Sequence, residues 1–252
     1  MEVPVTQLRP KSHEVPLVLT RGTVRAAASM AEQVFRTLRS AIVTMRLQPG
    51  EALSEQEIAG RLNVSRQPVR EAFIKLADDG LVRVVPQRGT FVMKISADAV
   101  TNARFVREAV ECAIAREAAE RITAADIKAL QRLIAEQRKA ANVDNPEAFF
   151  VLDEEFHRTL ATASGCAYAW KVIESAKAQM DRVRFLSVPE ETPMRRLIAQ
   201  HKAILDGVAD GDGETAAAAM QVHLREILSS LPRLAQTFPA MFDAGQEPDK
   251  EN

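Results

Sequence analysis

The sequence predicts a mainly α-helical protein, in which an N-terminal winged helix-turn-helix of three helices and a two-stranded wing precedes an all-α antiparallel helical bundle. Three observations support this fold class. Apolar residues recur every three or four positions through most of the chain, which indicates amphipathic helices. Two adjacent segments rich in β-branched residues, LVRVV and TFVMKI, follow the third predicted helix. From Asp98 to about Pro239 strand signals vanish, and short polar breaks separate the helical segments.

Length and composition fit two globular domains. The chain has 252 residues, of which 46% are hydrophobic and 27% charged. No apolar run of about 18 residues could span a membrane, and the first residues lack the order of a secretion signal. We therefore expect a cytoplasmic protein with no membrane partner. Cys112 and Cys166 show no metal-ligand spacing, so we expect both to be small buried apolar residues.

The net charge of −1 conceals an asymmetry between the two ends of the chain. Residues 1–95 carry 14 Lys and Arg against 9 Asp and Glu, whereas the remainder carries 19 against 25. The basic part comes first. Such a division favours an N-terminal domain that faces a polyanion.

The first domain is expected at residues 28–96, after a mobile arm at 1–27 that contains three prolines and no sustained periodicity. Its first helix begins near Ala28, carries an apolar stripe that includes Met30, and ends at Pro49-Gly50. A second helix begins at the capping box formed by Ser54 and Glu57. A third begins at Ser65, with Pro68 tolerated in its first turn. Its expected core residues are Val69, Phe73, Ile74 and Leu76.

The start of the third helix is the segment expected to read DNA. In a helix-turn-helix the second helix of the pair enters the major groove, and its first residues reach bases and phosphates. Ser65 can cap the helix or contact a phosphate, and Arg66 can pair with a guanine edge. The hairpin tip adds a basic residue and a glycine where a wing crosses the minor groove or the backbone. The expected DNA contacts are Ser65, Arg66, Gln67, Arg70, Arg88 and Gly89.

The segment LQPGEALSEQEIAGRLNVSRQPVREAFIKLADDGLVRVVPQRGTFV resembles the N-terminal domain of GntR-type regulators, with every element in the same order. The resemblance implies that Ser65, Arg66, Gln67, Arg70 and Gly89 contact operator DNA. It also implies that a homodimer binds a palindromic operator. Gln56 departs from the pattern, because many relatives in sister branches carry an arginine there that also contacts DNA.

The second domain is expected at residues 97–240, with a C-terminal tail at 241–252. Breaks with turn or capping residues, such as Thr123 and Ser164-Gly165, divide it into helices whose short connections make neighbours antiparallel. The helices are expected near 98–121, 125–141, 146–164, 168–187, 193–210 and 214–236.

Three histidines and one aspartate are candidate metal ligands in this bundle. Asp153 and His157 are four residues apart, so they project from the same face of one helix. His201 and His223 lie on consecutive helices, each eleven residues from Asp212 in the turn between them. Both therefore lie about 16 Å from that turn and at the same height in an antiparallel pair. Such a set suits Zn²⁺ or another first-row divalent ion, Ni²⁺ and Mn²⁺ included.

The second domain also resembles the FCD ligand-sensing domain of the FadR branch of GntR regulators, through DxxFH at 153–157, HxxIL at 201–205 and HL at 223–224. The resemblance implies that Asp153, His157, His201 and His223 bind the metal, whose open positions hold a carboxylate effector. It also implies that an arginine on the first helix of the domain assists, and Arg107 has that place. The alternative role of Arg107 is an ion pair with Glu111. Arg104 and Arg158 are weaker candidates.

The predicted function is a ligand-responsive transcriptional regulator, a repressor of a catabolic operon that senses a small organic acid. A metal sensor without an organic effector is one alternative. A metalloenzyme is the other, because Glu154 and Glu155 lie beside the ligands, but the sequence offers no recognisable motif for a general base.

Overall fold

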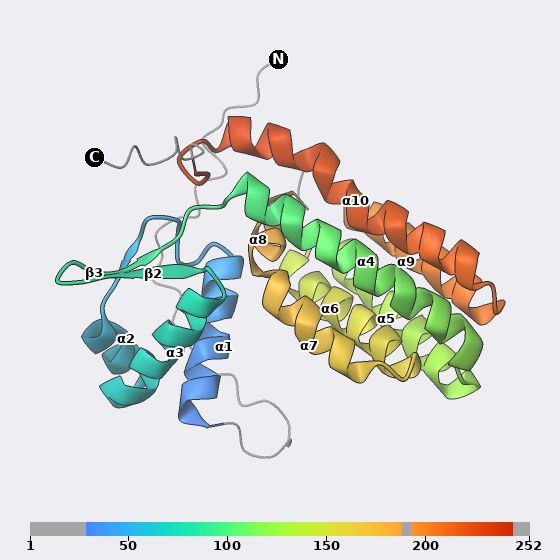
Figure 1. Cartoon of the computed structure of the whole chain (residues 1–252), viewed down its shortest axis with the longest axis horizontal. Helices are drawn as coiled ribbons and strands as arrows, with labels where there is room; N and C mark the ends of the chain where they lie inside the picture. The colour runs from blue at the N-terminus through green and yellow to red at the C-terminus, as the bar shows by residue number, and fades with distance from the viewer. Residues whose placement is uncertain (1–28, 188–192, 244–252) are drawn as a thin grey trace.

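The computed structural model describes residues 29–187 and 193–243. The arm expected at 1–27, the break at 188–192 and most of the expected C-terminal tail lie outside these ranges. Within them the chain forms ten helices and one small sheet (Figure 1). The predicted fold class, a winged helix-turn-helix followed by an all-α bundle, is confirmed.

The N-terminal domain has the predicted helices and one strand that the sequence does not signal. The extra strand, β1, has only two residues, too few for an alternating pattern. It pairs antiparallel with β3, which pairs with β2, so the strand order is β1-β3-β2. The elements are α1 (Met30–Val43), β1 (Ala52–Leu53), α2 (Glu55–Leu62), α3 (Arg66–Asp78), β2 (Val82–Val85) and β3 (Gly89–Val92).

The core of this domain lies between α1 and α3. Val34 and Leu38 of α1 pack with Phe73 of α3, and all three are buried. The prediction that Ile74 belongs to this core is wrong, because its side chain is 56% exposed. One helical position turns a side chain by about 100°, so Ile74, next to the buried Phe73, points to solvent. Met30, at the first turn of α1, is likewise exposed.

The C-terminal bundle contains seven helices, and α4 runs through it beside α10 (Figure 1). Helix α5 begins where the sequence indicates, with a full capping box formed by Thr123 and Asp126. The helices are α4 (Ala97–Arg121), α5 (Ala124–Asn142), α6 (Pro146–Ala163), α7 (Ala167–Ala176), α8 (Ala178–Ser187), α9 (Met194–Ala209) and α10 (Gly213–Thr237).

The single helix predicted at 168–187 is two helices, α7 and α8, that meet at Lys177. Lys177 is buried, and its ammonium group lies 2.5 Å from a carboxylate oxygen of Asp181. No glycine or proline marks this break, so neither the periodicity nor the turn residues predict it. Cys112 is buried as expected, but Cys166 is exposed, because it lies in the surface turn that precedes α7.

Helix α8 connects the bundle to the N-terminal domain. Ala178 packs in the core of that domain, and the Gln179 amide donates to the carbonyl oxygen of Gly80 at 2.7 Å. A guanidinium nitrogen of Arg39, on α1, lies 3.2 Å from a carboxylate oxygen of Asp181. Figure 1 shows α8 between α1 and the rest of the bundle. No helix within the described ranges is long and apolar enough to cross a membrane.

Gly207 brings α9 and α10 into close contact near the turn that joins them. A Cβ atom at Gly207 would lie 2.7 Å from the backbone nitrogen of Ala216, which cannot move without shifting α10. We expect Gly207→Ala to lower the free energy of unfolding by about 1–3 kcal/mol through overpacking. Urea denaturation measures the effect.

Gly60, also helical, supplies the matched control for this substitution. A Cβ atom there would have no neighbour within 4 Å. Gly60→Ala should therefore stabilise the protein by about 0.5–1 kcal/mol, because alanine favours helix more than glycine does. Equal effects at both positions would show that the α9–α10 contact is not tight.

Candidate metal centre and nucleic-acid interface

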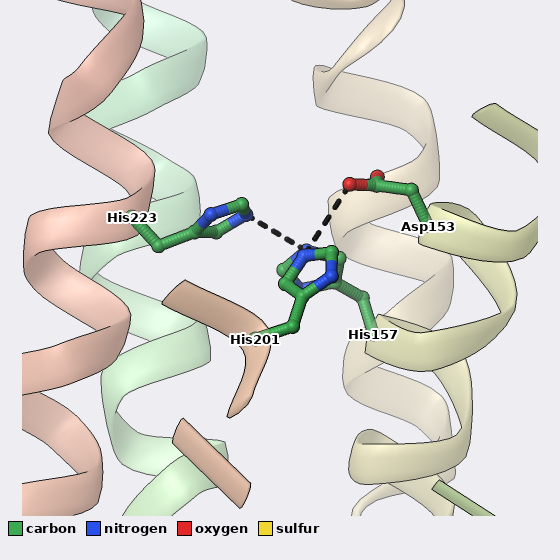
Figure 2. A group of neighbouring side chains, drawn as sticks. All are labelled: Asp153, His157, His201 and His223. Atoms are coloured by element: carbon green, nitrogen blue, oxygen red, sulfur yellow. Dashed lines mark hydrogen bonds and ion pairs between the residues drawn. The ribbon is translucent and has the colours of Figure 1, made fainter. Parts of the chain in front are cut away.

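The four predicted ligand residues come together inside the bundle. Asp153 and His157 project from one face of α6, and His201 and His223 reach toward them from α9 and α10 (Figure 2). All four side chains are buried, and one potential ligand atom from each lies within 4.8 Å of the others. The equal distance of His201 and His223 from Asp212 therefore places their rings at one level, with centroids 4.6 Å apart.

Each imidazole has its Nδ1 atom beside a side-chain oxygen. At His201 and His223 the glutamine oxygen accepts the Nδ1 proton, which leaves the Nε2 atom unprotonated in a neutral ring. Nearby hydrogen-bonding groups of this kind orient metal-binding histidines in many proteins. The pairs are His157 with Glu111 at 2.5 Å, His201 with Gln137 at 2.9 Å and His223 with Gln200 at 3.0 Å.

The Nε2 atoms consequently face one another. Those of His157 and His223 are 3.1 Å apart, and that of His201 is buried without a hydrogen-bond partner, 3.4 Å from Oδ1 of Asp153. Two imidazole nitrogens at such a distance repel one another unless a proton or a metal ion lies between them. Three imidazole nitrogens and one carboxylate oxygen are a donor set typical of Zn²⁺ and similar ions, so these residues fit a metal.

The protonation states of the cluster also suit metal binding. Burial lowers the pKa of His223 well below its ordinary value, and it lowers the pKa of His201, so both rings are neutral. Burial alone would raise the pKa of Asp153, but Arg184, His201 and His157 together hold it well below its usual range. A histidine binds a metal through a neutral imidazole, and an aspartate binds it through a charged carboxylate.

Arg184, on α8, is a member of this site that the sequence analysis missed. Its Nη2 atom donates to Oδ1 of Asp153 at 2.6 Å, and both side chains are buried. The two residues are 31 positions apart on different helices. Because the two residues lie on different helices, no local pattern indicates this contact.

Arg107, the predicted effector-binding residue, is buried and forms the alternative ion pair. Its Nε atom donates to Oε1 of Glu111 at 2.5 Å. It also lines a cavity of about 20 Å³, which Arg184, Ser187 and His223 line as well. The two weaker candidates do not line this cavity. Arg104 pairs with Glu108, and Arg158 pairs with Glu155.

The predicted DNA contacts of α3 lie on an exposed face. Ser65 precedes the helix, and its hydroxyl makes no capping hydrogen bond, so it is free to meet a phosphate. Guanidinium nitrogens of Arg66 and Arg70 lie 3.0 Å and 3.1 Å from the carboxylate of Glu55, and the Gln67 amide donates to Glu71 at 3.0 Å. Glu55, at the start of α2, thus contacts both arginines. The sequence analysis did not single out this residue.

The wing presents the other two predicted residues. Arg88 is exposed in the turn between β2 and β3. Gly89 has a φ of +110°, a conformation that residues with a Cβ atom rarely adopt, which explains glycine at this position. Gln56, where some relatives carry an arginine, is exposed at the start of α2.

A winged helix-turn-helix with exposed arginines on α3, joined to a helical bundle, is the architecture of a DNA-binding transcriptional regulator. Residues 30–92 match the gntR family of bacterial regulatory proteins, and residues 103–226 match the FCD domain. The chain belongs to the GntR family. It is a transcriptional regulator and not an enzyme.

Curated relatives and solved structures agree with this assignment. The chain is 44% identical to the HTH-type transcriptional repressor RspR of Escherichia coli K12, over 81% of this chain and 90% of the relative. It is 37% identical to an HTH-type transcriptional regulator in an unstable DNA locus of Streptomyces ambofaciens, over 87% and 93%. Escherichia coli McbR/YncC shares the fold, with a TM-score of 0.71 at 20% identity over 84% and 99%. A GntR regulator from Rhodococcus sp. RHA1 has a TM-score of 0.66 at 26% identity over 84% and 99%.

Proposed function

We propose that this protein is a ligand-responsive repressor of a catabolic operon, which senses a small organic acid at a divalent metal held by Asp153, His157, His201 and His223. Zn²⁺ is the first choice of metal, and Ni²⁺ and Mn²⁺ are the others. The observation that carries the proposal is the convergence of three Nε2 atoms and one carboxylate oxygen, with each Nδ1 atom beside an acceptor. We propose repression, not activation, because the relative RspR is named a transcriptional repressor.

The DNA target we propose is a palindromic operator bound by a homodimer. Two recognition helices must lie about 34 Å apart to enter successive major grooves. In each protomer Arg66, Gln67 and Arg70 would face the groove, with Ser65 near a phosphate and the wing residues Arg88 and Gly89 alongside. The exposed face of α3 supports this arrangement.

The proposed effector is a carboxylate that completes the metal coordination and contacts Arg107. Four protein ligands leave an octahedral ion, or a five-coordinate zinc, with room for a further oxygen donor. The buried guanidinium of Arg107 lines the same cavity as His223 and can form a bidentate pair with a carboxylate.

Helix α8 offers a physical connection between effector and operator. Arg184 contacts the ligand residue Asp153, and Asp181, one turn earlier on the same helix, contacts Arg39 of the N-terminal domain. A shift of α8 at Arg184 would therefore alter its contact with the DNA-binding domain at Asp181. Any such coupling is reciprocal, so operator and effector must change each other's affinity by the same factor.

A metal sensor without an organic effector is the second candidate, and the size of the cavity favours it. About 20 Å³ holds one water molecule, so an organic acid enters only if the cavity widens. Addition of organic acids to protein already saturated with metal separates the two functions. An acid that raises the melting temperature and changes operator affinity supports the first, and a response to metal alone supports the second.

The contribution of Arg107 is tested with the variant Arg107→Met, Glu111→Gln. This pair of changes removes both buried charges, whereas loss of Arg107 alone would leave the Glu111 carboxylate unpaired. The glutamine still offers an oxygen to His157. We expect normal metal content and operator affinity with loss of the effector response, and Arg158→Met, an exposed position, should respond normally. A wild-type response in the Arg107 variant would show that the metal alone holds the ligand.

A further inference from the structure

Arg184 is a buried cation that touches the ligand residue Asp153 and has no contact with the effector in the proposed function. Its side chain is about 10% exposed and lies in the wall of the cavity beside the imidazole cluster. An effector that bridges the metal and Arg107 would need no second guanidinium there. The proposed effector therefore leaves the function of Arg184 in the cavity wall unexplained.

Arg184 and a bound metal would share the same oxygen atom. Oδ1 of Asp153 accepts from Nη2 of Arg184 at 2.6 Å, and the same Oδ1 atom lies 3.4 Å from Nε2 of His201. It is thus the oxygen that faces the imidazoles and is placed to bind the ion. A divalent cation on this oxygen repels the guanidinium and takes over the charge that held it. Binding of metal to Asp153 would therefore weaken its pair with Arg184 and leave the guanidinium able to bind another anion.

The charges around the centre show what the released side chain needs. Each buried arginine already has one carboxylate partner, Arg107 in Glu111 and Arg184 in Asp153. The three histidines add no charge once they bind an ion, because a metal-binding imidazole is neutral. The remaining carboxylate in the cavity wall, Glu226, lies 2.8 Å from its own partner Arg196.

A divalent ion therefore adds two uncompensated positive charges to a buried site. Excess charge in a low-dielectric interior is costly unless it is paired. A ligand with one carboxylate removes only half of the excess. A ligand with two anionic groups removes all of it.

We propose that the effector is an organic acid with two negatively charged groups, and that Arg184 binds the second group once the metal has engaged Asp153. This inference rests on the proposed metal-dependent sensing and narrows its ligand to a dianion. The first group coordinates the metal beside Arg107, and the second forms a bidentate pair with Arg184. Met180, Leu197 and Ile227 in the cavity wall suit a short hydrocarbon spacer between the groups.

The test compares acids of equal carbon number on the metal-loaded protein by isothermal titration calorimetry. The pairs are propionate and malonate, butyrate and succinate, and valerate and glutarate. We expect the dianion of at least one pair to bind at least about tenfold more tightly than its monoanion in the wild type. Arg184→Met should bring that ratio close to one, whereas Arg158→Met, a matched change at the surface of α6, should keep it.

Two results would overturn the proposal. In one, metal-loaded wild-type protein shows no preference for any of the three dianions. In the other, the preference survives in Arg184→Met. Metal content, measured before any acid is added, separates this failure from that of the proposed function, because protein that takes up no metal contradicts both.

A second readout does not depend on the acids. Without metal, Arg184→Met leaves the buried carboxylate of Asp153 without its cation, so its melting temperature should fall clearly below that of the wild type. With metal bound, the ion replaces the guanidinium and the difference should shrink. Arg184→Lys retains the charge and should be more stable than Arg184→Met without metal. A purely structural Arg184 would give the same loss of stability with and without metal.

Discussion

Arg66→Ala and Arg70→Ala are each expected to weaken operator binding, but in different ways. Arg66, if it forms a bidentate pair with a guanine, should cost about 1–3 kcal/mol and relax specificity at one base pair. If Arg70 contacts a phosphate, its substitution should lower affinity for all sequences alike. It should also reduce the slope of log affinity against log salt concentration by about one. Fluorescence anisotropy with an operator selected from random duplexes, and with a scrambled duplex, measures both effects at several salt concentrations.

The ion pairs with Glu55 do not prevent these arginines from reaching DNA. Arg66 and Arg70 are exposed, and exposed ion pairs contribute about 0–1 kcal/mol, so a phosphate or a guanine can replace Glu55. Lys75→Ala is the control, because Lys75 lies on the same helix but pairs with Glu32 of α1 at 2.8 Å. It should bind the operator normally. Unchanged titrations for both arginine variants would remove α3 as the reading helix.

Short-range patterns predict most of the fold and the candidate ligands. The spacing of Asp153 and His157 places them on one helical face, and equal distances from the α9–α10 turn place His201 and His223 level. These inferences succeed because helical rise and periodicity are fixed by the backbone. Wherever a position depends only on its own helix and the next turn, sequence suffices.

Features that depend on packing between distant helices were not predicted. The break at Lys177 falls at a buried lysine and not at a turn residue. Gln137 and Gln200 look like ordinary surface positions in the sequence, yet each faces the Nδ1 atom of a histidine on another helix. Arg184 contacts Asp153 from another helix, 31 positions away along the chain. Such contacts combine elements that no local pattern relates to one another.

Loss of the metal is the largest effect we expect in the bundle. Wild-type protein should bind about one divalent ion per chain through its four ligands, and the double substitution His201→Ala, His223→Ala should reduce this content to near zero. Inductively coupled plasma mass spectrometry after reloading with Zn²⁺, Ni²⁺ or Mn²⁺ gives the stoichiometry. Cys166→Ala, which removes an exposed thiol outside the cluster, should leave the content unchanged.

Substitution of the glutamines beside the histidines should weaken metal binding without abolishing it. Gln200→Leu removes the oxygen that faces Nδ1 of His223, and Gln137→Leu does the same for His201. Each should weaken metal affinity by about 10–100-fold without abolishing it, since the ligand remains but its orientation and tautomer are no longer fixed. Competition with a coloured chelator measures these affinities. If wild-type protein refuses all three metals, or if the double histidine variant keeps its full content, the cluster is a buried polar network, and the three converging Nε2 atoms must be stabilised by protonation instead of by an ion.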